Sequence, residues 1–391
     1  MAGDSAIRPN VSQLSALLAS IIAAVLLAAP LWSDAPGVMP AAGVILFAIV
    51  NWATGALPQH ITALLLFLIT VVLKIAPADV VFSGFHASAT WLVFGGFIIS
   101  IAAQQSGLAA RIVRVLLTHL PARYLAMAAG LAGAGVLLSF IMPSASGRVV
   151  LMVPLAVALA GRLGFAERTR ARHGLVIAAG WGTTIPAFGI LPSNVVNMAF
   201  VGASESIFGI GFTYFGYTVL NFPILGVLAT MISVILITLL FGAKPNPQGD
   251  AEMGTRTSPA EQRLMAIMLI ALAFWMTDSL HGISPAWVSL GAGIVCALPV
   301  IGVLPAGQIM PKLNFGPIIF LAAVVGMGTV VTQTGLGENL AQFLISKIDL
   351  TADSGLQKFA SIVGLGWLLQ LVTTLPGQPA IMTAVAAPLA S

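Results

Sequence analysis

Residues 139–154, SFIMPSASGRVVLMVP, lie in the middle of a long apolar segment that has basic residues on both sides. The flanking basic residues are Arg111, Arg114, Arg123, Arg162, Arg168, Arg170 and Arg172. Cytoplasmic loops of membrane proteins carry an excess of Lys and Arg, so both ends of the segment are expected on the cytoplasmic face. The centre, Pro-Ser-Ala-Ser-Gly at 143–147, holds a helix breaker, two hydroxyls and a glycine. The chain is therefore predicted to enter the membrane here and to return.

The two arms of this segment, 124–140 and 147–160, are short for a membrane span. Each would be about 20–25 Å long at about 1.5 Å per residue, against a hydrocarbon core of about 30 Å. Irregular backbone at that depth is tolerated only where protein buries it or it lines a wet cavity. We favour a re-entrant hairpin over 124–160. Two short full spans joined by a tight turn are the alternative.

The composition indicates an all-α polytopic membrane protein. The 391 residues are 59% hydrophobic and 7% charged, with a mean hydropathy of +1.04, far from a soluble average. The net charge of +4 does not indicate nucleic acid, because the basic residues lie in short loops between spans. Cys296 is the only cysteine, which excludes a disulfide within the chain and a thiolate metal site.

Apolar runs predict the membrane spans outside the hairpin. They cover 14–33, 41–58, 61–73, 91–107, 174–201, 214–242, 264–280, 286–304 and 315–335. With the N-terminus inside, the outer segments hold only Lys74, Lys347 and Lys358 among the loop cations. This bias predicts a cytoplasmic N-terminus in a plasma or inner membrane.

The chain divides at a linker rich in Pro, Gly, Thr and charge. The predicted parts are N-terminal helices at 1–75, a first repeat at 76–242, a cytoplasmic linker at 243–263 and a second repeat at 264–391. The first repeat contains the hairpin 124–160, a broken helix 174–201 and a helix 214–242, and the second contains a hairpin at 358–390. No counterpart of 174–242 follows the second hairpin, so the second repeat is expected to be truncated.

The two halves share an ordered set of sequence features. Gln-Ser-Gly-Leu at 105–108 and Gln-Thr-Gly-Leu at 333–336 each follow an apolar helix and precede an amphipathic stretch. Each half then has an apolar segment broken by Pro and Gly. The predicted spans open these two segments from opposite faces, which indicates inverted-topology repeats, and paired broken segments point to a transporter's binding site.

Three motifs resemble the divalent anion:sodium symporter family, the sodium-coupled sulfate and dicarboxylate carriers of the ion transporter superfamily. They are FSGF at 82–85, WLVFGGF at 91–97 and SGLAARI at 106–112. The resemblance covers most of 76–390. It implies two inverted repeats, each with a hairpin and a broken helix, in a homodimer that works by an elevator-like movement.

The hairpin tips depart from the family's Ser-Asn-Thr, whose side chains hold substrate and help to enclose sodium. The first tip reads Ser-Ala-Ser at 144–146 and lacks the amide, and the second reads Thr-Leu-Pro-Gly-Gln at 374–378. The stretch GILPSN at 189–194 is similar to the family's Gly-Thr-Pro-Pro-Asn break, with one residue extra. The site residues therefore carry over only in part.

The residues at these breaks are the candidate site. The predicted substrate-binding residues are Ser144, Ala145, Ser146, Arg148, Pro192, Ser193, Thr374, Gly377 and Gln378. The predicted sodium ligands are Ser144, Gly147, Thr183, Thr184, Gly189 and Asn194. Hard cations take oxygen ligands, and N–H groups at a helix start attract anions. The alternative is that the small residues only let helices pack closely.

Arg148 is the only charged residue deep in an apolar arm. It either snorkels to the cytoplasmic interface or stays in water because the hairpin is short. The functional alternative is a fixed counter-charge for an anion, since intramembrane charges are costly and usually functional. The carboxylates lie near predicted helix ends, so a proton relay lacks parts. The five histidines are scattered, and no nucleotide, zinc or nucleophile motif is present. No enzyme is predicted.

These observations lead to a secondary active transporter of a small divalent anion, of the sulfate or dicarboxylate class. The resemblance implies sodium-coupled symport, with sodium as coupling ion and no other cofactor. The first alternative is a sodium-independent exchanger or uniporter in which Arg148 replaces a bound cation. The second is a non-transporting truncated paralogue or membrane scaffold. The expected partners are the lipid bilayer, the anionic substrate and a second copy of the chain.

Overall fold

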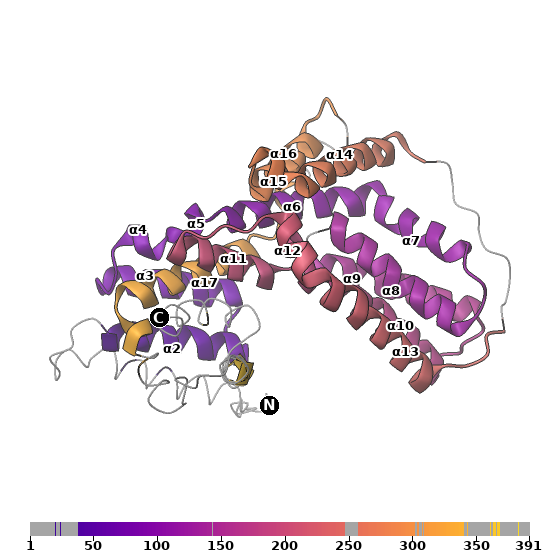
Figure 1. Cartoon of the computed structure of the whole chain (residues 1–391), viewed down its shortest axis with the longest axis horizontal. Coiled ribbons are helices and arrows are strands. Elements are labelled where there is room, and N and C mark those ends of the chain that lie inside the picture. The colour runs from indigo at the N-terminus through magenta and orange to yellow at the C-terminus, as the bar shows by residue number, and fades with distance from the viewer. Residues whose placement is uncertain are drawn as a thin grey trace, which may run out of the picture. The chain divides into compact units, whose positions relative to one another are not determined.

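The computed structural model describes residues 38–142, 144–246, 257–301, 303–304, 307 and 309–339, with isolated residues of the two terminal regions. Within these ranges every regular element is a helix (Figure 1), which confirms the all-α class. Apart from isolated residues, the predicted span 14–33 and the hairpin 358–390 lie outside the described residues, and so do Thr374, Gly377 and Gln378. The chain forms two compact units.

The first unit is drawn from Met1–Thr90, Ala199–Gly211 and Phe315–Ser391. Its described helices are α2 (Val38–Thr54), α3 (Gln59–Val72), α4 (Ala78–Val81), α5 (Ser83–His86), α17 (Gly316–Gln333) and the adjoining parts of α6 (Ser88–Ser106) and α11 (Val195–Phe208). Helix α17 is apolar on all sides and packs against α3 and α5. Its Phe320 lies edge-on to Trp52 of α2, with 4.9 Å between the ring centroids. A helix of this kind is buried.

A carboxylate fixes the start of α6 in this unit. Glu205 Oε2 accepts hydrogen bonds from the Ser88 backbone N at 3.1 Å and from Ser88 Oγ at 2.6 Å. A negative charge stabilises the positive end of a helix dipole. Glu205 lies near a helix end, as predicted, and its role there is structural.

The second unit is drawn from Trp91–Met198 and Phe212–Asn314. Its helices are α7 (Leu108–Thr118), α8 (Tyr124–Ile141), α9 (Ala145–Arg162), α10 (Arg170–Thr184), α12 (Tyr214–Asn221), α13 (Ala229–Phe241), α14 (Pro259–Met276), α15 (Asp278–His281) and α16 (Pro285–Ala297). Helix α10 packs against α8, α9 and α13, so these four form a bundle (Figure 1). Helices α12 and α13 are joined by a π-helical segment, Phe222–Leu228, and form one apolar stretch of 28 residues.

A left-handed glycine follows the last apolar helix turn in each half. Gly107 has φ +83°, and the helices on its two sides, α6 and α7, are bent by 62°. Gly335 has φ +73° and follows α17. Only glycine adopts this conformation without a steric cost, which explains the matching Gln-Ser-Gly-Leu and Gln-Thr-Gly-Leu. The predicted helix ends are confirmed; the inverted relation of the two halves stays a prediction.

The structure corrects three predicted boundaries. The span 286–304 ends at Ala297, and the span 264–280 is interrupted at Thr277. The linker 243–263 ends at Ser258, because a capping box between Ser258 and Glu261 starts α14 at Pro259.

The hairpin arms are longer than predicted. Helices α8 and α9 have 18 residues each, which is about 27 Å at 1.5 Å per residue. Both belong to the five described helices that are long and apolar enough to cross a membrane, or six if α6 and α7 count as one span. The short-arm argument for a re-entrant hairpin was therefore wrong, and its re-entrant character stays a prediction.

Candidate functional site

The hairpin tip lies between the end of α8 at Ile141 and the start of α9 at Ala145. Ser144 is the N-cap of α9, and its Oγ accepts a hydrogen bond from the Gly147 backbone N at 3.2 Å. Serine is favoured at this position because its oxygen satisfies a free N–H of the first helical turn. The Ser146 hydroxyl lies 3.5 Å from Ser144 Oγ and is exposed. The tip thus presents hydroxyls at the positive end of an 18-residue helix.

The helix break between α10 and α11 is held by side-chain amides. Two 3₁₀ turns, Pro186–Gly189 and Leu191–Ser193, separate the helices. Asn197 Nδ2 donates to the carbonyls of Ala187 and Ile190, both at 2.9 Å, and Asn194 Oδ1 accepts from the Val196 backbone N at 3.1 Å. Buried backbone groups need such partners. Within the predicted broken helix 174–201, α10 ends at Thr184 and α11 begins at Val195.

Arg148 joins the tip to the break. Its Nη1 donates to the Met142 carbonyl, its Nη2 to the carbonyls of Thr183 at 2.9 Å and Ser193 at 3.2 Å, and its Nε to Thr183 at 3.3 Å. Met142 caps the C-terminus of α8, and Thr183 lies in the last turn of α10. The guanidinium therefore lies at the negative ends of two helices, where a cation is stabilised.

The Arg148 side chain is completely buried, with 0% exposure. The snorkelling interpretation was therefore wrong. Within the described part of the chain its partners are carbonyls alone, and no carboxylate pairs with it. Carbonyl dipoles stabilise the guanidinium but carry no net charge. One positive charge is thus held between tip and break without a counter-charge.

Close helix packing sets the geometry of these partners. Gly135 of α8 faces Gly182 of α10, so the two backbones meet directly before Thr183. Ser193 Oγ donates to the Ser139 carbonyl of α8 at 2.8 Å. The bundle therefore fixes the carbonyls that Arg148 contacts.

Comparison with known proteins places the chain in a family. The family described as "CitMHS: Citrate transporter" matches residues 44–391. The chain belongs to the citrate transporter family. This confirms the resemblance to anion carriers of the ion transporter superfamily and makes the chain a member of a family of membrane transporters, not of enzymes.

Two curated proteins are similar to the chain at 24–25% identity. A "Membrane protein" of Cupriavidus necator is 25% identical over 353 residues, which cover 84% of this chain and 68% of that protein. An "Arsenical pump membrane protein" of Escherichia coli is 24% identical over 238 residues, which cover 59% of this chain and 52% of that protein. The second match thus spans about half of the E. coli protein.

In this citrate transporter family member, the structure brings part of the predicted substrate site together. Arg148 contacts the carbonyl of Ser193, and its backbone N donates to the Ser144 carbonyl at 3.1 Å. Ala145 is the first residue of α9, and Pro192 is buried in the second 3₁₀ turn. Sequence reasoning missed the carbonyl of Met142, since any residue could supply it.

Most oxygens of the predicted sodium ligands already have partners. The Thr183 and Thr184 hydroxyls donate to the Gly180 carbonyl at 2.7 and 2.9 Å, and the Thr183 carbonyl accepts from Arg148. Gly189 packs against Phe222. In this arrangement the Arg148 guanidinium donates hydrogen bonds to the carbonyl oxygens that lie between the tip and the break.

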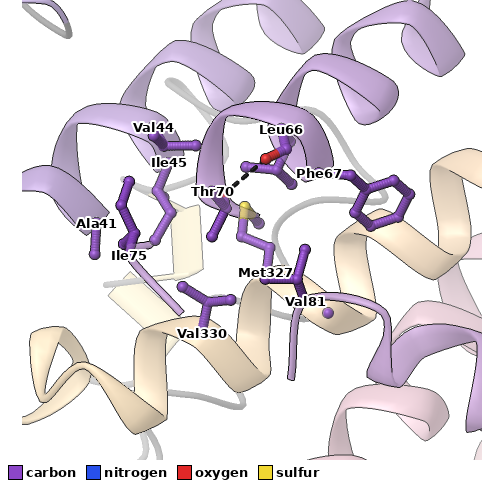
Figure 2. Close-up of a pocket in the computed structure, with 11 residues that line it drawn as sticks. Ala41, Val44, Ile45, Leu66, Phe67, Thr70, Ile75, Val81, Met327 and Val330 are labelled. Atoms are coloured by element: carbon purple, nitrogen blue, oxygen red, sulfur yellow. Dashed lines mark hydrogen bonds between the residues drawn. The ribbon is translucent and has the colours of Figure 1, made fainter. Parts of the chain in front are cut away.

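Two cavities elsewhere in the described residues do not suit an anion. In the first unit, a cavity of about 10 Å³ lies among α2, α3 and α17 and has room for one water at most (Figure 2). Its Thr70 hydroxyl is already bonded to the Leu66 carbonyl at 2.7 Å (Figure 2). In the second unit, a groove of about 360 Å³ between α14 and α16 is lined by apolar residues such as Phe274 and Trp287. The tip and the break remain the candidate site.

Proposed function

We propose that this protein is a sodium-independent secondary transporter of a small carboxylate, in which Arg148 takes the place of a bound coupling cation. The observation that supports this is the position of the guanidinium, which is buried among the carbonyls of Met142, Thr183 and Ser193. Carbonyl oxygens at helix breaks are the ligands that a hard cation takes. The first alternative from the sequence is thus favoured over sodium symport.

The unpaired charge of Arg148 gives the site its preference for anions. A bound anion would supply the missing counter-charge, and Coulomb attraction is strong at low dielectric. The start of α9 adds hydroxyls and N–H groups, which donate to carboxylate oxygens. The family description "Citrate transporter" supports a carboxylate. Sulfate and an arsenical such as arsenite are the competing substrates, the arsenical from the name of the E. coli relative.

We further propose that the chain consists of two inverted repeats and moves its site across a plasma or inner membrane by an elevator-like movement, as a homodimer with a cytoplasmic N-terminus. The matching left-handed glycines Gly107 and Gly335 support the repeat. The basic residues around α7 and at the start of α10 support the orientation.

Uptake into proteoliposomes tests the function. Labelled citrate, succinate, sulfate and arsenite are offered under a sodium gradient, a proton gradient and no cation gradient. We expect citrate or succinate uptake that does not require sodium. Uptake that requires sodium would instead support the symport implied by the resemblance. The absence of uptake of every anion under every gradient would support the non-transporting paralogue.

A further inference from the structure

A glutamine from a distant helix reaches the hairpin tip. Gln104 lies in the last turn of α6, and its side-chain amide is next to Gly147. A Cβ on Gly147 would lie 2.9 Å from Gln104 Nε2 and 3.2 Å from Ser144 Oγ. The absence of a side chain at 147 therefore allows the amide to approach the first turn of α9.

The amide joins a group of hydrogen-bond donors that have few partners. Gln104 and Ser146 are exposed, and in the described part of the chain the Gln104 amide has no hydrogen-bond partner. The hydroxyls of Ser144 and Ser146 are 3.5 Å apart, so only one of them can donate to the other. Accessible donors from two helices thus meet at the tip.

The buried charge of Arg148 supplies the independent reason to assign an anion here. Arg148 lies one turn into α9, and its backbone N donates to the Ser144 carbonyl at 3.1 Å. Its guanidinium is fully buried and has only carbonyl partners among the described residues. A buried cation without a counter-charge among the described residues, borne by the helix whose first turn meets these accessible donors, favours a ligand that is negative and accepts hydrogen bonds.

We propose that Gln104 is a specificity-determining residue of the anion site, and that its amide N–H donates to a carboxylate oxygen of the substrate beside Ser144 and Ser146. This inference rests on the proposed function and names a contact within it. An amide and two hydroxyls select ligands by their acceptor oxygens. An ionised carboxylate offers only acceptors, whereas each oxygen of neutral arsenite carries a proton. The site should therefore prefer carboxylates to arsenite.

Cysteine protection tests whether Gln104 contacts the ligand. The native Cys296 is fully buried, so a hydrophilic maleimide should label Gln104→Cys or Gln105→Cys selectively. Gln105 is the matched control, because it is also exposed and lies one residue further along α6. We expect citrate to slow the labelling of Gln104→Cys severalfold and to leave Gln105→Cys unchanged. Equal effects at the two positions, or none at either, would overturn the inference.

Introducing a negative charge at position 104 tests the same contact through affinity. Gln104→Glu keeps the shape but replaces the donor by a negative acceptor. A hydrogen bond to a charged group contributes about 1.5–3 kcal/mol, so we expect KM for citrate to rise about 10- to 150-fold. Gln105→Glu should stay near the wild-type value. A wild-type KM in Gln104→Glu would refute the contact while leaving transport established. Protection at Gln104→Cys without any uptake would instead support the contact and refute transport.

Discussion

The contact between α8 and α10 predicts a large difference between two neighbouring glycine substitutions. Gly182→Ala would place a Cβ 2.9 Å from Ala132 Cβ and closer still to the Ala132 backbone, whereas a Cβ on Gly180 has no atom within 4 Å. Carbon atoms pack at about 3.5–4.0 Å, so the helices must separate by about 1 Å in Gly182→Ala. The separation also moves Thr183, whose carbonyl accepts from Arg148.

The cost follows from these two effects. Overpacking costs about 1–3 kcal/mol, and a weakened hydrogen bond to a charged group costs up to about 3 kcal/mol. Both substitutions gain the same helix propensity of about 1 kcal/mol, so the difference between them isolates the packing. We expect Gly182→Ala to be about 2–5 kcal/mol less stable than Gly180→Ala.

The free energy of unfolding in detergent micelles, measured for both variants against the wild type, provides the assay. Gly180→Ala should match or exceed the wild-type stability. Equal stabilities of the two alanine variants would refute the close contact of α8 and α10. It would also refute the claim that this contact positions the Thr183 carbonyl.

Two carboxylates that cap helices give further predictions. Glu205→Ala removes both hydrogen bonds to Ser88 and should cost about 1–2 kcal/mol of unfolding free energy. Glu167→Ala is the control, because the exposed Glu167 carboxylate lies 3.9 Å from Arg172 and its removal should cost almost nothing. Equal losses in the two variants would contradict the capping role of Glu205. Asp278→Ala leaves the buried Tyr214 N–H without its acceptor and should cost about 1–3 kcal/mol. Asp278→Asn keeps an acceptor oxygen and should cost less; the reverse order in a denaturant titration would show that the charge is what matters.

The sequence predicts those parts of the fold that local chemistry decides. The hairpin tip, the break at 185–194 and the helix end at Gly107 were all readable, because Pro, Gly and hydroxyl residues act on their own neighbours. The start of α14 was also readable from Ser258 and Glu261, a capping-box spacing. The prediction nevertheless included both residues in the linker 243–263, because this segment is rich in Pro, Gly, Thr and charge.

The remaining features depend on tertiary contacts. Arg148 could be recognised as unusual, but its partners come from the ends of two helices and from a 3₁₀ turn, and their carbonyls are independent of residue type. Gln104 is separated from the hairpin tip by α7 and α8, so no spacing relates them. The second arm of the hairpin was predicted too short, because Ala145 was assigned to the tip and Arg162 to the flanking basic residues, although both are helical.

The sodium dependence of Arg148→Ala tests the central claim that the guanidinium replaces a coupling cation. In this variant the carbonyls of Met142, Thr183 and Ser193 lose their partner, and the shorter side chain leaves space for a small cation. Citrate uptake into proteoliposomes is measured in choline and in sodium medium for the variant and the wild type. We expect the wild type to transport equally in both media, and Arg148→Ala to transport only in sodium. Wild-type uptake that requires sodium, or an Arg148→Ala variant that transports equally well in choline, would contradict the account.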